Sequence, residues 1–365
     1  ETVALVGESG SGKTVTALAV TQLLPYPKAN HPSGSIKFNG KELMGITEEN
    51  LRKIRGNRIG MIFQEPMTSL NPLHTLEKQI GEVLLLHKGL SRSNAQEQIL
   101  DLLQQVGLPN AENLMQSFPH QLSGGQRQRA MIAMSLANDP DLLIADDPTT
   151  ALDVTVQAQI LALLKSLQIS RQMSVLLITH DLTIVRKFAN KVYVMTNGRI
   201  VENGPTSLIF KKPQHSYTQH LLESEPKGKK STTSQNSAIV LKSENLKIWF
   251  PVKRGVLRRL TGYVKAVDGV SVQIREGHTL GVVGESGSGK TTLALGLLRL
   301  EKSQGPILFL GEPLQGKKWK ALRPLRKEMQ IVFQDPYGSL SPRMSVGQII
   351  EEGLLIHQST LGDGK

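Results

Sequence analysis

The sequence has 365 residues, with 43 Lys and Arg against 31 Asp and Glu, and a formal net charge of +12. This length suffices for two hydrophobic cores, and the lack of cysteine in the sequence excludes disulfides, thiolate zinc sites and cysteine-ligated iron–sulfur clusters within it. No apolar stretch approaches the roughly 20 residues that cross a bilayer, so we expect any membrane role to come through partner subunits.

The first predicted element is a short apolar strand, Val3 to Val6, followed by Gly-Glu-Ser-Gly-Ser-Gly-Lys-Thr. Such a loop between a buried strand and a helix turns backbone N–H groups toward a di- or triphosphate, at the positive end of the helix dipole. Its glycines permit positive φ and close approach of the backbone to oxygen. The predicted nucleotide-binding residues are Gly7, Glu8, Ser9, Gly10, Ser11, Gly12, Lys13 and Thr14. Lys13 would neutralise the β and γ phosphates, and the Thr14 hydroxyl would ligate Mg²⁺.

Further along the chain, Gly34 to Gly40 has the alternation and turn residues of a hairpin. The segment Ile62 to Pro72 follows it. Asp141 to Ala145 and Ser174 to Ile178 each have strand character and lead into a longer amphipathic segment. This alternation predicts an α/β fold with parallel strands at the centre of the sheet.

A second copy of the octapeptide begins 277 residues after the first, behind the apolar run Leu280 to Val283. Gly305 to Gly311 repeats the hairpin, and Val332 to Pro342 repeats the segment Ile62 to Pro72. One long self-similarity at a single large period indicates two copies of a domain. The second set of predicted nucleotide-binding residues is Gly284, Glu285, Ser286, Gly287, Ser288, Gly289, Lys290 and Thr291. Lys290 would neutralise the β and γ phosphates, and the Thr291 hydroxyl would ligate Mg²⁺.

The polar, apolar-poor stretch from Glu225 to Ser237 is typical of a flexible linker. We therefore expect a first domain over 1–222, a linker over 223–240 and a second domain over 241–365. The sequence starts at Glu1 with only six residues before the first loop, whereas roughly forty residues of folded character precede the second. This difference predicts that the first domain lacks its N-terminal strands.

The net charge invites a nucleic-acid interpretation, with the densest basic cluster at Lys253, Arg254, Arg258 and Arg259. No aromatic-interleaved basic motif accompanies this cluster, and only 4% of the residues are aromatic. We expect no nucleic-acid partner, and interpret the cluster as solvated surface or as an attraction to anionic lipid headgroups.

Leu122-Ser-Gly-Gly-Gln126 opens a helical run, and at this point the sequence resembles the ATP-binding cassette family. The resemblance implies two P-loop ATPase domains, each with a mixed, mostly parallel sheet and a helical signature subdomain. In that family the signature, here Ser123, Gly124, Gly125 and Gln126, caps the γ-phosphate of ATP bound to the opposite cassette. Ser123 and the bare backbone of the two glycines provide a donor-rich anion site at a helix start.

The other motifs follow in the order of the family. Asp146, at the end of an apolar strand, resembles the Walker B carboxylate that holds Mg²⁺. Asp147 stands where the family nearly always has the glutamate that polarises the attacking water. An arm shorter by about 1.5 Å should misplace this carboxylate and put the hydrolysis rate in doubt, though not nucleotide binding. The remaining matches are Ala151-Leu-Asp153 for the D-loop, His180 for the switch histidine, and Gln64 and Gln334 for the Q-loop glutamines, which ligate Mg²⁺ and sense the transmembrane subunit.

Two segments, Gln64 to Pro72 and Pro213 to Leu222, resemble the oligopeptide, dipeptide and nickel importer ATPases, and the tandem arrangement is most similar to the microcin C and oligopeptide type. The resemblance implies ATP and Mg²⁺ as cofactors. It implies as partners two transmembrane permease subunits and a periplasmic or lipid-anchored solute-binding protein. It also implies a peripheral location on the cytoplasmic face of the bacterial inner membrane and ATP-driven import of peptides or peptide-like solutes.

In the family, two cassettes pack head to tail, so that each ATP lies between one loop and the other cassette's signature. The first signature begins 116 residues after its loop, and an equivalent in the second copy would fall near residue 400. We therefore expect the second domain to lack its C-terminal part, and neither composite site to be complete in this polypeptide. The family also stacks an aromatic side chain on adenine; Phe250 or Tyr263 could supply it in the second copy.

The mechanism implied for the intact protein is ATP-driven closure of the cassettes, coupling through the Gln64 and Gln334 segments, and hydrolysis that resets the pair. Three alternatives stay open. One is a cassette ATPase that acts on ribosomes or DNA and is not coupled to transport. Another, suggested by Asp147, is a nucleotide-gated module with weak hydrolysis. The third and weakest is a kinase, because kinases do not contain the signature pentapeptide.

Overall fold

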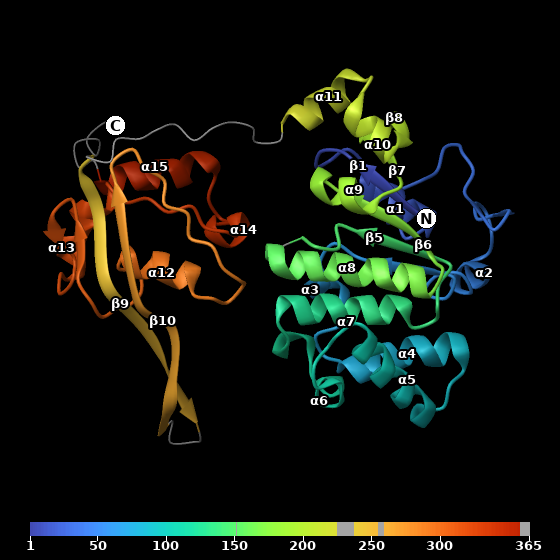
Figure 1. The fold of residues 1–365 in the computed structure, drawn as a ribbon, viewed down its shortest axis with the longest axis horizontal. Coiled ribbons are helices and arrows are strands. Elements are labelled where there is room, and N and C mark those ends of the chain that lie inside the picture. Colours follow the sequence, from blue (N-terminus) through green and yellow to red (C-terminus); the bar gives the residue numbers. More distant parts are fainter. Residues whose placement is uncertain (151, 225–236, 255–258, 358–365) are drawn as a thin grey trace. The chain divides into compact units, whose positions relative to one another are not determined.

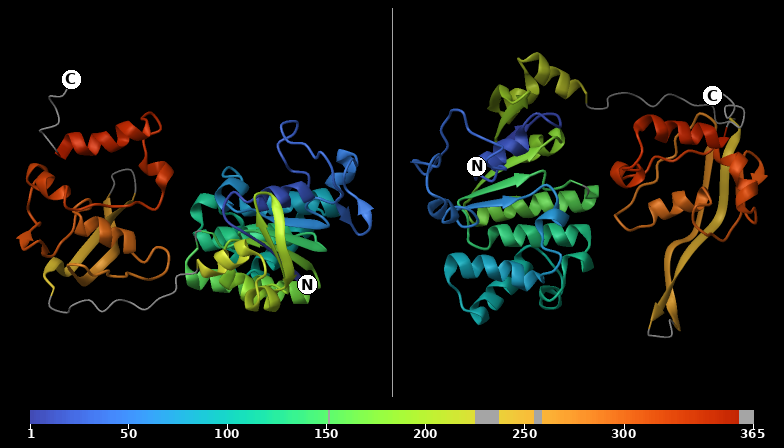
Figure 2. Two further views of the ribbon diagram at one scale, coloured as in Figure 1. Left: turned by 90° about the horizontal axis from the view of Figure 1, so that it is seen from above. Right: turned by 180° about the vertical axis from the view of Figure 1, so that it is seen from behind.

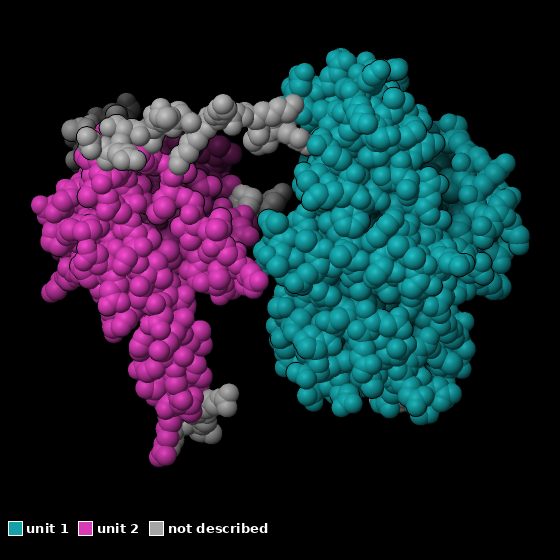
Figure 3. Space-filling view, in the orientation of Figure 1, with its two compact units in different colours: residues 1–229 teal, residues 230–365 magenta. Residues whose placement is uncertain are grey.

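The computed structural model describes residues 1–150, 152–224, 237–254 and 259–357. The chain divides into two compact units, unit 1 (Glu1–Lys229) and unit 2 (Lys230–Lys365), coloured separately in Figure 3. Most of the expected linker, and Arg258 of the basic cluster, lie outside the described residues. None of the helices formed by the described residues is long and apolar enough to cross a membrane.

Unit 1 is built on a six-stranded sheet with the order β4-β5-β6-β1-β7-β8. All neighbouring strands run parallel except the β7–β8 pair, which is antiparallel. The strands are β1 (Thr2–Val6), β4 (Ile59–Ile62), β5 (Leu142–Asp146), β6 (Ser174–Thr179), β7 (Lys191–Thr196) and β8 (Arg199–Pro205). The predicted α/β fold with parallel central strands is therefore confirmed.

Helices cover both faces of this sheet, because neighbouring residues along each buried strand point to opposite sides (Figure 1). Leu5 and Ile144 pack with Ala17 of α1 (Lys13–Val20) on one face. On the other face, Leu143 packs in the core that contains α7 (Gly124–Leu136) and α8 (Val154–Ser170). Ala4 and Val6 face α9 (Leu182–Phe188) and α10 (Thr206–Lys211) on that side.

The remaining elements of unit 1 form a small hairpin and a helical subdomain. The hairpin strands are β2 (Lys37–Phe38) and β3 (Lys41–Glu42), joined at Asn39 and Gly40, both of which have positive φ, as the predicted turn requires. The helices are α2 (Glu48–Arg52), α3 (Pro66–Ser69), α4 (Leu76–Lys88), α5 (Arg92–Gln105), α6 (Ala111–Met115), the 3₁₀ turn η1 (Pro119–Gln121) and, after β8, α11 (Ser216–Glu223).

The described part of unit 2 contains an antiparallel sheet with the order β10-β9-β11-β12, and residues of two helices join its core. Its long hairpin, β9 (Ile239–Arg254) and β10 (Arg259–Arg275), extends well past the helix α12 (Lys290–Leu297), as Figures 1 and 2 show. The other elements are β11 (Ile307–Phe309), β12 (Glu312–Pro313), α13 (Trp319–Arg326), α14 (Pro336–Ser339) and α15 (Val346–His357).

The buried strand expected before the second loop does not form. Residues 280–283 have no regular structure, and Val283 is 92% exposed. In unit 1 the equivalent strand, β1, has β6 and β7 as hydrogen-bonding neighbours on its two sides. No strand in the described residues of unit 2 pairs with 280–283, and Val332, which corresponds to Ile62 of β4, is likewise 97% exposed. The mixed, mostly parallel sheet predicted for each domain is therefore present in unit 1, whereas the sheet in the described residues of unit 2 is antiparallel.

Candidate functional site

The first phosphate loop has the backbone that its glycines allow. Gly7, Gly10 and Gly12 have φ values of 157°, 81° and 101°, which side-chain-bearing residues rarely adopt. A Cβ on Gly7 would lie 2.1 Å from the carbonyl oxygen of Met195 in β7, so the loop is also pressed against the sheet. The Lys13 ammonium closes the loop by donating to the carbonyls of Gly7 (2.9 Å) and Glu8 (2.8 Å).

The sheet brings the other predicted residues to this loop. Asp146 is the last residue of β5, Gln64 and His180 lie just after β4 and β6, and the loop follows β1. These are four adjacent parallel strands, whose carboxyl ends meet at one edge. The Thr14 hydroxyl donates to Oδ1 of Asp146 at 3.2 Å. Thr14, Gln64 and Asp146 line one open pocket of about 480 Å³. The structure therefore places the three magnesium candidates of unit 1 together.

Burial shapes the charges of this site. Asp146 is 2% exposed, and desolvation is the main reason that its pKa is raised; the charge of Asp147 raises it further, while the Thr14 hydrogen bond and Lys13 oppose the shift. Desolvation likewise lowers the pKa of Lys13, against the attraction of the two carboxylates. The site thus holds a buried ammonium beside two buried carboxyl groups.

Asp147 is turned toward the predicted switch histidine. Its backbone has a φ of 41°, and its N–H donates to the carbonyl of Ile178 at 2.8 Å. Nδ1 of His180 lies 3.2 Å from Oδ1 and 3.3 Å from Oδ2 of Asp147. The carboxylate is buried and the imidazole largely exposed. The Asp147 side chain is therefore held by His180, the residue that follows the neighbouring strand β6.

The side chains present fit a magnesium ion that arrives with a nucleotide. Among the described residues, no three His, Asp or Glu gather into a group that could hold a metal by themselves. The candidates are one carboxylate, one hydroxyl and one amide. Mg²⁺ usually keeps several waters and binds through one or two carboxylates and the phosphates of its substrate, which matches this sparse set.

The signature segment forms the start of α7. The Ser123 hydroxyl accepts from the N–H of Gln126 at 3.3 Å, and the Gln126 side chain accepts from the N–H of Ser123 at 2.9 Å. This capping box leaves the helix start exposed at Ser123 and Gly124. The signature residues do not line the pocket beside the first loop.

A tight contact joins the signature to the segment after β5. A Cβ on Gly125 would lie 3.0 Å from Cγ1 of Val156 in α8, whose first turn is capped by the Asp153 carboxylate at 2.9 Å from the Val156 N–H. Of the expected D-loop, Ala151 lies outside the described residues. Sequence reasoning did not foresee this packing role of Gly125, which depends on a helix packed against α7.

The second loop keeps its conformation with less support. Gly284, Gly287 and Gly289 have φ values of 157°, 82° and 94°, and the Lys290 ammonium donates to the carbonyls of Gly284 (2.8 Å) and Glu285 (2.6 Å). Gly289 packs on the hairpin, because a Cβ there would lie 2.0 Å from the carbonyl oxygen of Ala266. Gln334 is exposed, and among the described residues no hydrogen bond joins it to Thr291.

The hairpin register separates the two candidate adenine-stacking aromatics. Along β9, Ile248 and Phe250 share a face, and Ile248 packs on α12, where a Cβ on Gly296 would lie 2.3 Å from its Cδ1. Tyr263 pairs with Pro251 on the opposite face, and its ring lies 6.0 Å from that of Trp249. Phe250 is therefore on the face that carries the second loop.

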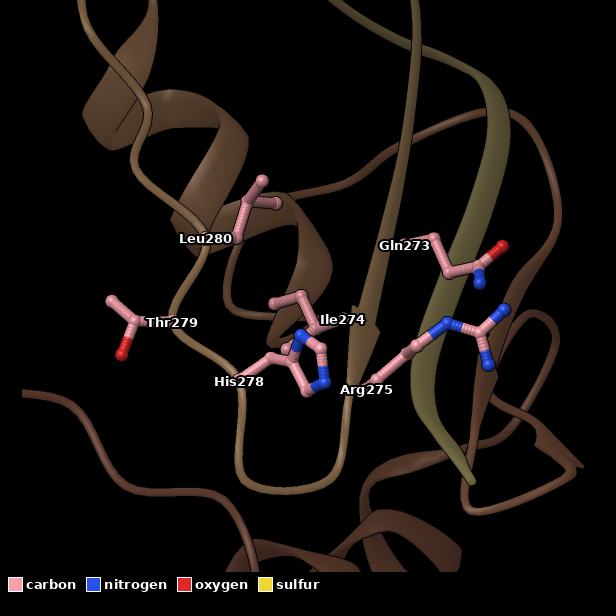
Figure 4. Close-up of a pocket in the computed structure, with 6 residues that line it drawn as sticks. All are labelled: Gln273, Ile274, Arg275, His278, Thr279 and Leu280. Carbon is pink, nitrogen blue, oxygen red and sulfur yellow. The ribbon is translucent and has the colours of Figure 1, made fainter. Parts of the chain in front are cut away.

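Unit 2 has a pocket of about 390 Å³, which is formed by residues that precede the second loop in the sequence (Figure 4). Six residues line it: Gln273, Ile274, Arg275, His278, Thr279 and Leu280. None of them belongs to the predicted site residues.

Comparison with known proteins gives one consistent result. The sequence profile of the family described as ABC transporter matches residues 1–150 and 267–360. A peptidoglycan transport ATP-binding protein, YejF, of Agrobacterium fabrum is 58% identical over 361 residues, which cover 99% of this chain and 66% of that protein. The glutathione import ATP-binding protein GsiA of Escherichia coli K12 is 43% identical over 389 residues, covering 98% of this chain and 62% of GsiA.

The chain thus spans about two thirds of the length of these relatives. Among solved structures, the dimeric ATP-binding cassette MJ0796, in a post-hydrolysis state bound to ADP and Pi, matches with a TM-score of 0.51 and 30% identity. That match covers 56% of this chain and 85% of the cassette.

Proposed function

We propose, from the premise that this chain belongs to the ABC transporter family, that it binds and hydrolyses ATP to power the import of peptides or peptide-like solutes. One observation carries the proposal. Four adjacent parallel strands bring the phosphate loop, Gln64, Asp146 and His180 to one edge of the sheet, with Thr14 hydrogen-bonded to Asp146. This is the arrangement that phosphoryl transfer needs, because its catalysis consists of positioning and charge stabilisation.

Each side chain then has a task. The loop amides and Lys13 bind the phosphates, and Thr14, Asp146 and Gln64 hold the magnesium ion. When bound, this ion neutralises charge that develops on the phosphate oxygens. Asp147 orients the attacking water, and His180, beside it, contacts the γ-phosphate.

The partners are part of the proposal. Two transmembrane permease subunits and a periplasmic or lipid-anchored solute-binding protein would complete the transporter, with this chain on the cytoplasmic face of the bacterial membrane. The names of two relatives, which refer to peptidoglycan transport and glutathione import, support a peptide-like solute. The second cassette would act in cis and head to tail, with no nucleic-acid partner.

Nucleotide binding tests the proposal directly. The purified chain should bind ATP with Mg²⁺, and Lys13→Ala and Lys290→Ala should each remove one site. Lys290 bridges loop carbonyls, so Lys290→Ala should leave the fold intact. Lys13 also lies beside the buried carboxyl groups of Asp146 and Asp147, so Lys13→Ala should lower the stability of unit 1 as well. Circular dichroism of both variants would verify that the protein stays folded. A folded chain without ATP affinity at either loop would refute the proposal.

One observation favours a second candidate, a nucleotide-gated module with weak hydrolysis. Asp147 is shorter than the usual glutamate, and both of its oxygens lie near His180. A carboxylate held in this way is poorly placed to reach a water beyond the γ-phosphate. ATP binding with little phosphate release would favour this candidate over the first.

A further inference from the structure

The importer-like segment Pro213 to Leu222 touches the first phosphate loop. Within it, the Tyr217 hydroxyl of α11 accepts a hydrogen bond from the backbone N–H of Glu8 at 3.1 Å, across 209 residues of sequence. The Tyr217 ring packs against the apolar cluster that contains Val6, the last residue of β1. A tyrosine with its ring in a core and its hydroxyl at a loop fixes that loop relative to the core.

The position of Tyr217 is set without help from the loop. The Glu202 carboxylate of β8 accepts from the N–H groups of Gln214 (2.8 Å) and His215 (3.1 Å), which fixes the chain just before α11. Nδ1 of His215 then caps the helix by accepting from the Tyr217 N–H at 3.1 Å. The hydroxyl therefore reaches Glu8 from an anchored helix.

Glu8 lies between this hydroxyl and the lysine that binds phosphate. Its N–H donates to Tyr217, and its carbonyl accepts from the Lys13 ammonium at 2.8 Å. The Glu8 N–H belongs to the same planar peptide as the Gly7 carbonyl, which accepts from Lys13 at 2.9 Å, so fixing this N–H also fixes a carbonyl that orients Lys13. The amides further along the loop, which a phosphate would use, stay free of this contact.

We propose that Tyr217 is a positioning residue that holds the first phosphate loop in its nucleotide-binding conformation, so that α11 forms part of the nucleotide site. This inference rests on the proposed function, because the nucleotide is its ligand. The second loop provides a contrast within the same chain. Among the described residues, no hydrogen bond to the Glu285 N–H is found, and Lys290 is more exposed than the buried Lys13.

The test compares Tyr217→Phe with Tyr193→Phe, which removes a hydroxyl from β7 away from the loop. Both are made in the Lys290→Ala protein, so that a fluorescent ATP analogue reports the first loop alone. Tyr217→Phe should weaken binding about three- to tenfold, as expected for loss of one hydrogen bond. Hydrogen exchange of the peptide over residues 6–11 should quicken, and Tyr193→Phe should change neither quantity.

The outcomes separate the two proposals. If the Lys290→Ala parent binds no nucleotide, the proposed function fails, while exchange still tests the role of Tyr217. If Tyr217→Phe keeps both the affinity and the exchange rate of its parent, the inference is wrong. A fall in the thermal midpoint with unchanged affinity and loop exchange would show a purely structural tyrosine and would also overturn it.

Discussion

His180 and Asp147 face each other across adjacent strands, with Nδ1 of the histidine 3.2 Å from Oδ1 of the carboxylate. Under the proposed function, this contact holds a side chain that is one methylene shorter than the glutamate expected at this position. Asp147→Glu should therefore extend the carboxylate by about 1.5 Å toward the attacking water. We expect steady-state phosphate release to rise, by up to about 100-fold, with ATP affinity unchanged. Asp147→Asn is the control, and its rate of phosphate release should fall below that of the parent. Equal rates for the parent and Asp147→Glu would contradict the hypothesis that Asp147 impairs turnover.

The buried carboxyl of Asp146 links nucleotide binding to stability. Because its pKa is raised in the folded protein, folding is penalised above that pKa, and stability increases as pH falls through it. Asp146→Asn keeps an acceptor for Thr14 and removes the penalty. We expect the nucleotide-free variant to unfold at a higher temperature than the parent at neutral pH, while its Mg²⁺-dependent ATP binding weakens.

This advantage should shrink when the pH is lowered from neutral to acid, because the raised pKa lets Asp146 of the parent take up its proton at a higher pH than an ordinary carboxyl would. Thermal unfolding at both pH values measures it. Asp141→Asn, which breaks only an exposed pair with Arg58, is the control and should cost less than about 1 kcal/mol. A less stable Asp146→Asn protein at neutral pH would contradict the argument.

The signature serine has two roles that substitution can separate. Ser123→Ala removes the cap of α7 and should cost about 1 kcal/mol of stability. Ser123→Asp keeps a capping oxygen and suits the helix dipole, so its stability should match the parent. The added negative charge should nevertheless oppose a triphosphate at this helix start and suppress ATP hydrolysis. Urea unfolding and phosphate release, measured on both variants, would show whether stability and activity separate in this way.

The two phosphate loops, identical in sequence, should respond differently to the same change. Gly7→Ala places a Cβ 2.1 Å from the backbone oxygen of Met195 and should destabilise unit 1 by about 1–3 kcal/mol. Gly284→Ala meets only the Ser288 side chain, with Oγ at 2.8 Å, and this hydroxyl can rotate away. Both tryptophans, Trp249 and Trp319, lie in unit 2, so their fluorescence reports that unit while circular dichroism reports both. Equal effects of the two changes would contradict this difference.

This difference between the loops also shows what the sequence could predict. The octapeptides, the strands ending at Asp146 and Thr179 and the turn at Gly40 follow from local pattern, and the structure has them. The exposure of Val283 does not follow from local pattern, because a buried strand forms only where other strands, distant in the sequence, pair with it. The contact of Tyr217 with Glu8 could not be predicted from the sequence either, because it depends on where the chain places α11 after β8 and α10.

The register of β9 and β10 leads to a last prediction, about adenine. Phe250 follows Ile248 on the face that packs on α12, whereas Tyr263 lies on the opposite face beside Trp249. In a Lys13→Ala protein, nucleotide binding reports the second loop. In that protein, Phe250→Ala should weaken ATP binding about 5- to 100-fold, which is the usual range for loss of base stacking. Tyr263→Ala should leave affinity within about twofold, because its ring points away from the loop. Inosine triphosphate should lose affinity on Phe250→Ala to a similar degree, since stacking tolerates a changed base. Weaker binding in the Tyr263 variant alone would mean that the hairpin presents its other face to the base.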